Sequence, residues 1–123
     1  ECYTQPMGLF LPARIAADDA AAIVRRKLEW ILSACTPDEV WLFGSAVTGD
    51  MTEASDVDLA VVFPDDAAIR AAQAKLSRIP RLDDWPHDLV WFRARDFHTR
   101  KTIGGLPMII SREGRKLYPE DSP

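Results

Sequence analysis

The sequence predicts a small α/β (α+β) fold in which helices flank one mixed β-sheet. Short apolar runs alternate with amphipathic segments, and Pro and Gly residues separate them. The length of 123 residues is enough for one core but not for two, and the hydrophobic content of 47% is typical of a globular protein. Because the first residue is Glu rather than Met, we expect residues 1–12 to be an N-terminal extension or expression remnant before one domain over 13–123.

Each expected element follows from periodicity and from breaking or capping residues. In the first helix, apolar residues recur at helical spacing, Asp18 or Asp19 can cap the start, and Pro37 stops it. Asp65 or Asp66 can cap the second long helix. The expected elements are a helix over 18–35, a strand over 40–43, a tight turn over 44–49, a strand over 56–63, a helix from 65 or 66 to about 78, a strand over 88–92, a short helix over 95–102, a helix over 106–112 and a short strand over 115–118.

The most informative stretch, GSAVTGDMTEASDVDL, joins the first two predicted strands. Gly44-Ser45 is followed, after ten residues, by Asp56-Val57-Asp58. Two carboxylates two positions apart on a strand point to the same face, and they are hard to keep ionised unless a cation sits between them. A Gly-Ser turn exposes backbone N–H groups and a hydroxyl that can bind phosphate. Together these residues predict a site for a metal-bound nucleoside triphosphate.

The charge of this region also favours a metal. From Asp38 to Asp66 there are eight acidic residues and no Lys or Arg, so a triphosphate would be repelled without a bridging cation. Mg²⁺ fits because one or two carboxylates together with substrate phosphates commonly hold it. Asp50 and Glu53, which lie in the intervening turn, are interpreted as solvated.

A third carboxylate is expected at the same edge of the sheet. If Gly44-Ser45 and the Asp pair serve one ligand, the first two strands are antiparallel. The third strand follows a long crossover that contains a helix, which favours parallel pairing with the second. Asp88 stands at the start of that third strand and would therefore lie beside Asp56 and Asp58.

Composition excludes several classes of protein. The net charge of −4 argues against non-specific nucleic-acid binding, so no direct binding to nucleic acid is expected. No apolar run approaches the roughly 20 residues of a membrane span, so no membrane association is expected either. Cys2 and Cys35 lack metal-ligand spacing and indicate the reducing cytoplasm, with Cys35 buried in the first helix. Residues 93–116 carry seven basic residues and two acids, which form either a solvated face or a patch for phosphates or an acidic partner.

With these motifs the chain resembles the DNA polymerase β-like nucleotidyltransferase superfamily, and its small size resembles the minimal nucleotidyltransferase branch. The resemblance covers about Ile23 to Tyr118 and includes the REGRKLY ending. It implies a palm-like nucleotidyltransferase fold and an enzyme that transfers a nucleoside monophosphate, AMP from ATP, to a hydroxyl acceptor with release of pyrophosphate. The implied roles are triphosphate binding by Gly44 and Ser45, and the ligation of two Mg²⁺ ions by Asp56, Asp58 and Asp88, with Asp88 also serving the attacking hydroxyl.

The resemblance also implies a partner. Minimal nucleotidyltransferases of prokaryotes often accompany a small helical HEPN-type RNase toxin, which some of them adenylylate on a tyrosine. The alternative is an antitoxin-like subunit that neutralises such a toxin by contact, with little or no catalysis. Family members often carry arginine in the turn after Gly-Ser, whereas here the turn is Ala46-Val47-Thr48, and Arg93, Arg95 or Lys101 are candidates to supply the charge. The acceptor, the nucleotide base and the oligomeric state, including a homo-oligomer, stay open.

Overall fold

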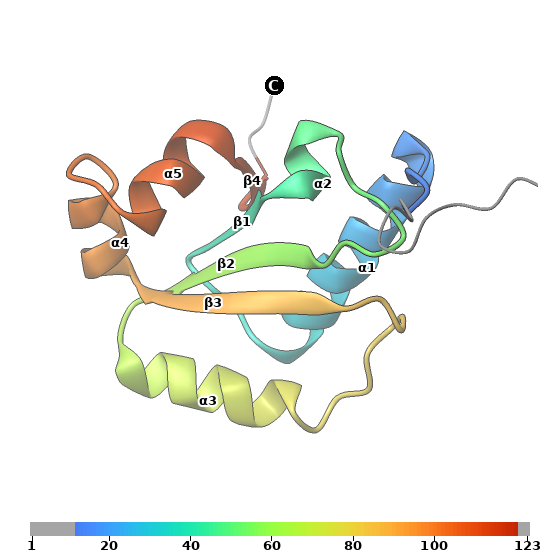
Figure 1. The fold of residues 1–123 in the computed structure, drawn as a ribbon. Coiled ribbons are helices and arrows are strands. Elements are labelled where there is room, and N and C mark those ends of the chain that lie inside the picture. Colours follow the sequence, from blue (N-terminus) through green and yellow to red (C-terminus); the bar gives the residue numbers. More distant parts are fainter. Residues whose placement is uncertain (1–11, 121–123) are drawn as a thin grey trace, which may run out of the picture.

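A computed structural model describes residues 12–120 of the chain, so the extension expected over 1–12 lies almost entirely outside the described residues. Helices and strands alternate as the sequence predicted, and Figure 1 shows them around one sheet. In chain order they are α1 (Ala17–Ala34), β1 (Glu39–Phe43), α2 (Ser45–Thr48), β2 (Val57–Phe63), α3 (Asp66–Leu76), β3 (His87–Arg93), α4 (Ala94–Arg100), α5 (Leu106–Glu113) and β4 (Arg115–Tyr118).

The four strands form one mixed sheet in the order β3-β2-β1-β4. β1 pairs antiparallel with β2 and with β4, whereas β2 and β3 are parallel. The parallel pair requires a crossover, and α3 provides it on one face of the sheet. The mixed α/β fold and the predicted direction of each pairing among the first three strands are therefore confirmed.

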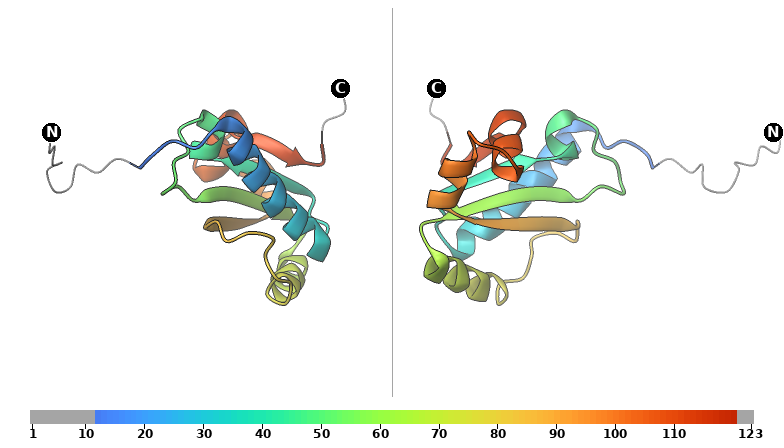
Figure 2. Two further views of the ribbon diagram at one scale, coloured as in Figure 1. Left: turned by 90° about the vertical axis from the view of Figure 1, so that its right-hand side faces the viewer. Right: turned by 60° about the vertical axis from the view of Figure 1, so that its left-hand side comes forward.

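Alternation along the strands divides the apolar side chains between two layers. Val57, Leu59 and Val61 of β2 pack with α1 and α3 in the larger core cluster. Ala60 and Val62 point the other way, toward Phe97 of α4 and Ile110 of α5. The sheet therefore has a helical layer on each face, and Figure 2 shows the two layers from two further directions. The face shared by α4 and α5 matters for function, because Asp58 has the same parity as Ala60 and Val62.

The element boundaries differ from the predicted ones by a few residues at most. Two local predictions are wrong. Asp18 and Asp19 do not cap α1, since its N-cap residue is Ala16 and no side chain caps it. Cys35 lies directly after α1 as its C-cap and is half-buried rather than buried within the helix. Among the helices of residues 12–120, none combines the length and the apolar content needed to cross a bilayer.

Candidate nucleotide and metal site

The turn between β1 and α2 lies against the start of β2. The antiparallel register pairs Phe43, the last residue of β1, with Asp58. Gly44 follows with φ +80°, a conformation that side-chain-bearing residues rarely adopt. A Cβ on Gly44 would lie 2.4 Å from Oδ2 of Asp58, so only glycine fits this close approach. The Gly-Ser turn and the Asp-x-Asp motif therefore meet, as the sequence predicted.

The third predicted carboxylate reaches the same place through the parallel pairing. Asp58 and Asp88 are direct partners in the register of β2 and β3. Directly paired residues share a face of the sheet, so both carboxylates belong to the face that α4 and α5 cover farther along. Asp56 lies just before β2, one residue ahead of Val57, and is exposed. The structure thus brings Asp58 and Asp88 side by side, with Asp56 next to them at the entry to β2.

The electrostatics of Asp58 reflect this crowding. Burial raises the pKa of the Asp58 carboxyl above its ordinary value of 3.8, and the negative charges of Asp88 and Asp56 raise it further. Asp88 is exposed, as Asp56 is, whereas Asp58 is half-buried. Neighbouring carboxylates repel one another when they are ionised. A divalent cation bound between them relieves this repulsion. Within residues 12–120, no three acidic, His or Cys side chains are already gathered closely enough to enclose a metal ion.

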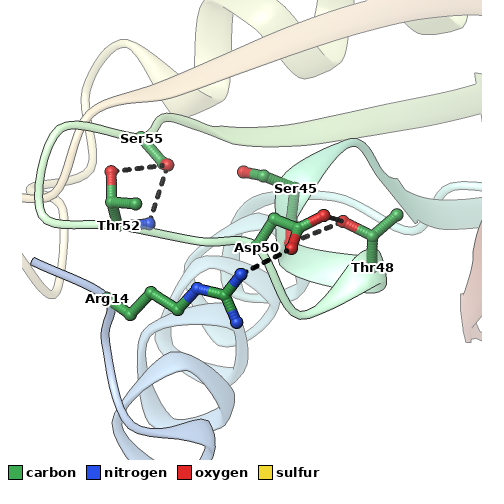
Figure 3. Close-up of polar contacts among 6 residues, drawn as sticks. All are labelled: Arg14, Ser45, Thr48, Asp50, Thr52 and Ser55. Atoms are coloured by element: carbon green, nitrogen blue, oxygen red, sulfur yellow. Dashed lines mark hydrogen bonds and ion pairs between the residues drawn. The ribbon is translucent and has the colours of Figure 1, made fainter. Parts of the chain in front are cut away.

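Ser45 begins α2, and a small polar network fixes this helical turn. The carbonyl oxygen of Ser45 accepts hydrogen bonds from the Asp50 amide at 3.2 Å and the Thr48 hydroxyl at 3.3 Å. The Thr48 hydroxyl also donates to the Asp50 carboxylate at 3.1 Å. Arg14 reaches the same carboxylate at 3.3 Å from the segment before α1, and Figure 3 shows it beside Ser45 and this network.

Arg14 is a candidate functional residue that the sequence did not reveal. It pairs with Thr52 through an isolated β-bridge, which holds the segment before α1 against the loop after α2. Arg14 and Arg115 also line one cavity of about 380 Å³ together with Ala46 and Val47 of α2. Two arginine residues therefore line a cavity next to the turn that lacks its own arginine. No sequence signal marks Arg14, because it is distant along the chain and lies outside any motif, whereas Arg115 belongs to the REGRKLY ending.

The basic residues suggested from the sequence lie elsewhere. Arg93 ends β3 and pairs in the register with Phe63 at the end of β2, so it stands at the opposite end of these strands from Asp58 and Asp88. Its guanidinium binds Asp96 at 2.7 Å and Asp66 at 3.7 Å. Arg95 is the second residue of α4, which follows the same end of β3. The idea that these two residues supply charge to the Gly-Ser turn is wrong, because four residues of extended strand lie between Arg93 and Asp88, which places them about 16 Å apart.

Comparison with known families identifies the family of this domain. The family model described as a nucleotidyltransferase domain matches residues 22–117, a range that contains all five predicted site residues. The chain belongs to this nucleotidyltransferase family. The match confirms the resemblance to the polymerase β-like nucleotidyltransferases, and it makes nucleotidyl transfer the general chemistry of this domain.

No curated protein matched this nucleotidyltransferase at a significant level. Among solved structures it is similar to a Sulfolobus solfataricus protein described as "a putative nucleotidyltransferase". The two are 20% identical, with a TM-score of 0.49, over 76% of this chain and 85% of the other.

Proposed function

We propose that this protein transfers AMP from ATP to a hydroxyl group on a partner protein, with release of pyrophosphate. The acceptor oxygen attacks the α-phosphorus, the bond to the bridging α,β-oxygen breaks, and the acceptor proton passes to a carboxylate. One observation carries the proposal: Asp58 and Asp88 are direct register partners, and the Gly44 backbone lies against Asp58. A triphosphate bound at the turn therefore has its reacting end beside the carboxylates.

Each site residue has a proposed task. The exposed N–H groups at the start of α2 and the Ser45 hydroxyl bind the β- and γ-phosphates. Asp56 and Asp58 carry the negative charge that a cation neutralises when the nucleotide arrives. Asp88 is exposed at the strand start, where it can take the proton from the attacking hydroxyl. Arg14, beside Asp50 and α2, contributes positive charge toward the phosphates in place of the missing turn arginine.

The carboxylates fit a divalent metal. Burial and the charges of Asp88 and Asp56 raise the pKa of Asp58, so the site favours a positive charge. Asp56, Asp58 and Asp88 would hold two Mg²⁺ ions. When bound there, they would supply acidity for the acceptor hydroxyl and charge stabilisation for the departing pyrophosphate.

An acceptor on another protein is supported by an exposed apolar surface. Around α5, Ile103 is 73% exposed, Ile109 is 45% exposed and Leu106 is 37% exposed. Basic residues flank this surface, including Arg100 and Lys101 at the end of α4. We propose a small helical HEPN-type protein as the partner and the reducing cytoplasm as the setting, in which Cys35 is a free thiol. The same surface favours the alternative, an antitoxin-like subunit that neutralises such a partner by contact alone.

A labelling experiment separates these functions. We expect a partner co-purified from the native host to take up label from ATP carrying ³²P at the α-position, and not from ATP labelled at the γ-position. Asp88→Asn should stop labelling but keep the partner bound, whereas the matched control Asp38→Asn, in the exposed turn before β1, should leave both unchanged. Partner binding without any labelling by the wild-type chain would instead establish the contact-only function.

A further inference from the structure

Lys27 on α1 is fully buried, which lysine rarely is unless it is paired. Its Nζ lies 2.7 Å from Oδ1 of Asp83, whose side chain is 10% exposed. It also donates a hydrogen bond to the carbonyl oxygen of Trp85. Burial lowers the pKa of the Lys27 ammonium, and the hydrogen bond to Asp83 opposes this shift. A buried ion pair often contributes little to net stability compared with apolar residues, so this pair calls for another explanation.

The loop that Lys27 holds is also fastened to the chain before β2. The indole N–H of Trp85 donates to the Ser55 carbonyl oxygen at 2.8 Å. The amide of Val57 donates to the Pro86 carbonyl oxygen at 3.0 Å. These two bonds lie on either side of Asp56 along the chain. They join the segment that leads into Asp58 to the segment that leads into Asp88.

Further contacts attach both ends of the same loop to α1. The indole N–H of Trp30, one turn after Lys27, donates to the Ile79 carbonyl oxygen at 2.9 Å. The Trp30 ring also packs against His87, the first residue of β3, with ring centroids 5.2 Å apart. Arg81 donates a second hydrogen bond to the Trp85 carbonyl oxygen. Residues 79–87 are thus held along their length against one face of α1.

We propose that Lys27 is a positioning residue that, through Asp83 and Trp85, sets how Asp88 lies relative to Asp56 and Asp58. α1 covers the face of the sheet opposite to the carboxylates, so Lys27 acts through the backbone of the loop. Asp88 is only two residues beyond Pro86, and Asp56 lies between the two residues that the loop binds. A displaced loop therefore moves the carboxylates apart. This inference rests on the proposed function, because it concerns the same metal-binding edge.

The test compares two variants at a temperature at which both are fully folded. Lys27→Met leaves Asp83 buried without its partner, so the main variant is Lys27→Met/Asp83→Leu, which removes both charges. Ile110→Ala is the matched control, because it weakens the apolar core on the other face of the sheet without touching the loop. The measurements are Mn²⁺ affinity in the presence of a non-hydrolysable ATP analogue, and hydrogen exchange of the Val57 amide.

We expect the double variant to bind Mn²⁺ at least about tenfold more weakly than wild type, as residues that orient metal ligands do. Its Val57 amide should exchange faster, and Ile110→Ala should alter neither quantity. Unchanged Mn²⁺ affinity in the double variant would overturn the proposal, whether or not Val57 exchange accelerates. A wild-type chain that binds no Mn²⁺ contradicts the proposed function instead, and the Val57 exchange rate then still shows whether Lys27 holds the two segments together.

Discussion

Two other stretches of the chain meet at the carboxylate of Asp58. The Gly44 backbone approaches it so closely that a Cβ would lie 2.4 Å from Oδ2. Asp88 stands beside it in the parallel register, and Asp56 lies two residues before it. Each neighbour adds either negative charge or desolvation, so the apo protein keeps an unfavourable electrostatic arrangement at this point. Such strain is tolerated when a bound ligand relieves it.

Asp58→Asn should abolish nucleotidyl transfer and stabilise the metal-free fold. The raised pKa of Asp58 means that the native state binds more protons than the unfolded chain above pH 3.8, so stability falls as pH rises through the titration of this group. Asparagine lacks that charge, and we expect the melting temperature at pH 7 to rise by up to about 3 °C. Thermal melts from pH 4 to 8 measure this. A variant that is less stable than wild type at pH 7 would show that relief of the crowding does not govern the change in stability.

Gly44→Ala should weaken nucleotide binding and also destabilise the fold. The alanine Cβ meets the Asp58 carboxylate and requires a strained backbone at φ +80°. A cost of about 1–3 kcal/mol is expected in urea unfolding. Gly49→Ala is the control, because it has a similar positive φ of +85° but nothing within 4 Å of the added Cβ. Equal losses of ATP affinity in both variants would mean that backbone strain alone, rather than the contact with Asp58, explains the effect.

The elements around the site are fixed by different kinds of signal. α3 begins where Asp65 accepts a hydrogen bond from the Ala68 amide at 2.8 Å, which is an ordinary N-cap. α1 has no such cap; its apolar face holds it to the sheet, and its buried Lys27 holds it to the loop before β3. The helix that makes the parallel crossover is therefore specified locally, whereas the helix that supports the loop before β3 depends on tertiary contacts.

Asp65→Ala should lower stability by about 1 kcal/mol and leave transfer unchanged. The side chain caps α3 at the far end of β2 from Asp58, so its loss weakens the helix without reaching the site. Urea unfolding and a transfer assay on the same sample measure the two effects. Asp66→Ala serves as the comparison within the same turn, since Asp66 is not the capping residue. A loss of transfer by Asp65→Ala alone would link α3 to the site.

Most of the element pattern could be predicted from the sequence, because apolar periodicity and Pro or Gly breaks are local signals. The meeting of Gly44 and Asp58 could be predicted on the assumption that their two motifs serve one ligand, and that of Asp58 and Asp88 from the long crossover that favours parallel pairing. Arg14 could not be predicted, because its approach to α2 depends on an isolated bridge to Thr52. The buried position of Lys27 could not be predicted either, because a lysine on a helix is ordinarily solvated and only the folded loop supplies its partners.

For the whole molecule, the site of the proposed chemistry and the proposed partner surface lie in different regions. The carboxylates lie at the start of β2 and β3, whereas α4 follows the other end of β3. The exposed apolar residues near α5 form a surface between Ile103 and Ile109. A helical partner could therefore be held on one region while its acceptor side chain reaches the other, which would keep binding and transfer separable.

The double variant Ile103→Asp/Ile109→Asp should reduce partner association at least about tenfold, because it places charge in the centre of an apolar contact. ATP and Mn²⁺ affinities should stay at the wild-type level, since neither position belongs to the carboxylates or to the Gly44-Ser45 turn. Surface plasmon resonance and calorimetry measure the two properties. Leu82→Asp is the control, because Leu82 is 54% exposed in the loop before β3. Equal loss in the control would show that any exposed acidic substitution, and not this surface, disturbs association.

The crossover through α3 also determines when the protein becomes competent during its synthesis. Gly44, Asp56 and Asp58 come from neighbouring strands joined by a short connection, so they can assemble early from local pairing. Asp88 arrives only after α3 has been made and the more distant β3 has closed onto β2. A nascent chain would thus bear a phosphate turn with an incomplete set of carboxylates. With the roles proposed for these residues, the site would be complete only once β3 has left the ribosome.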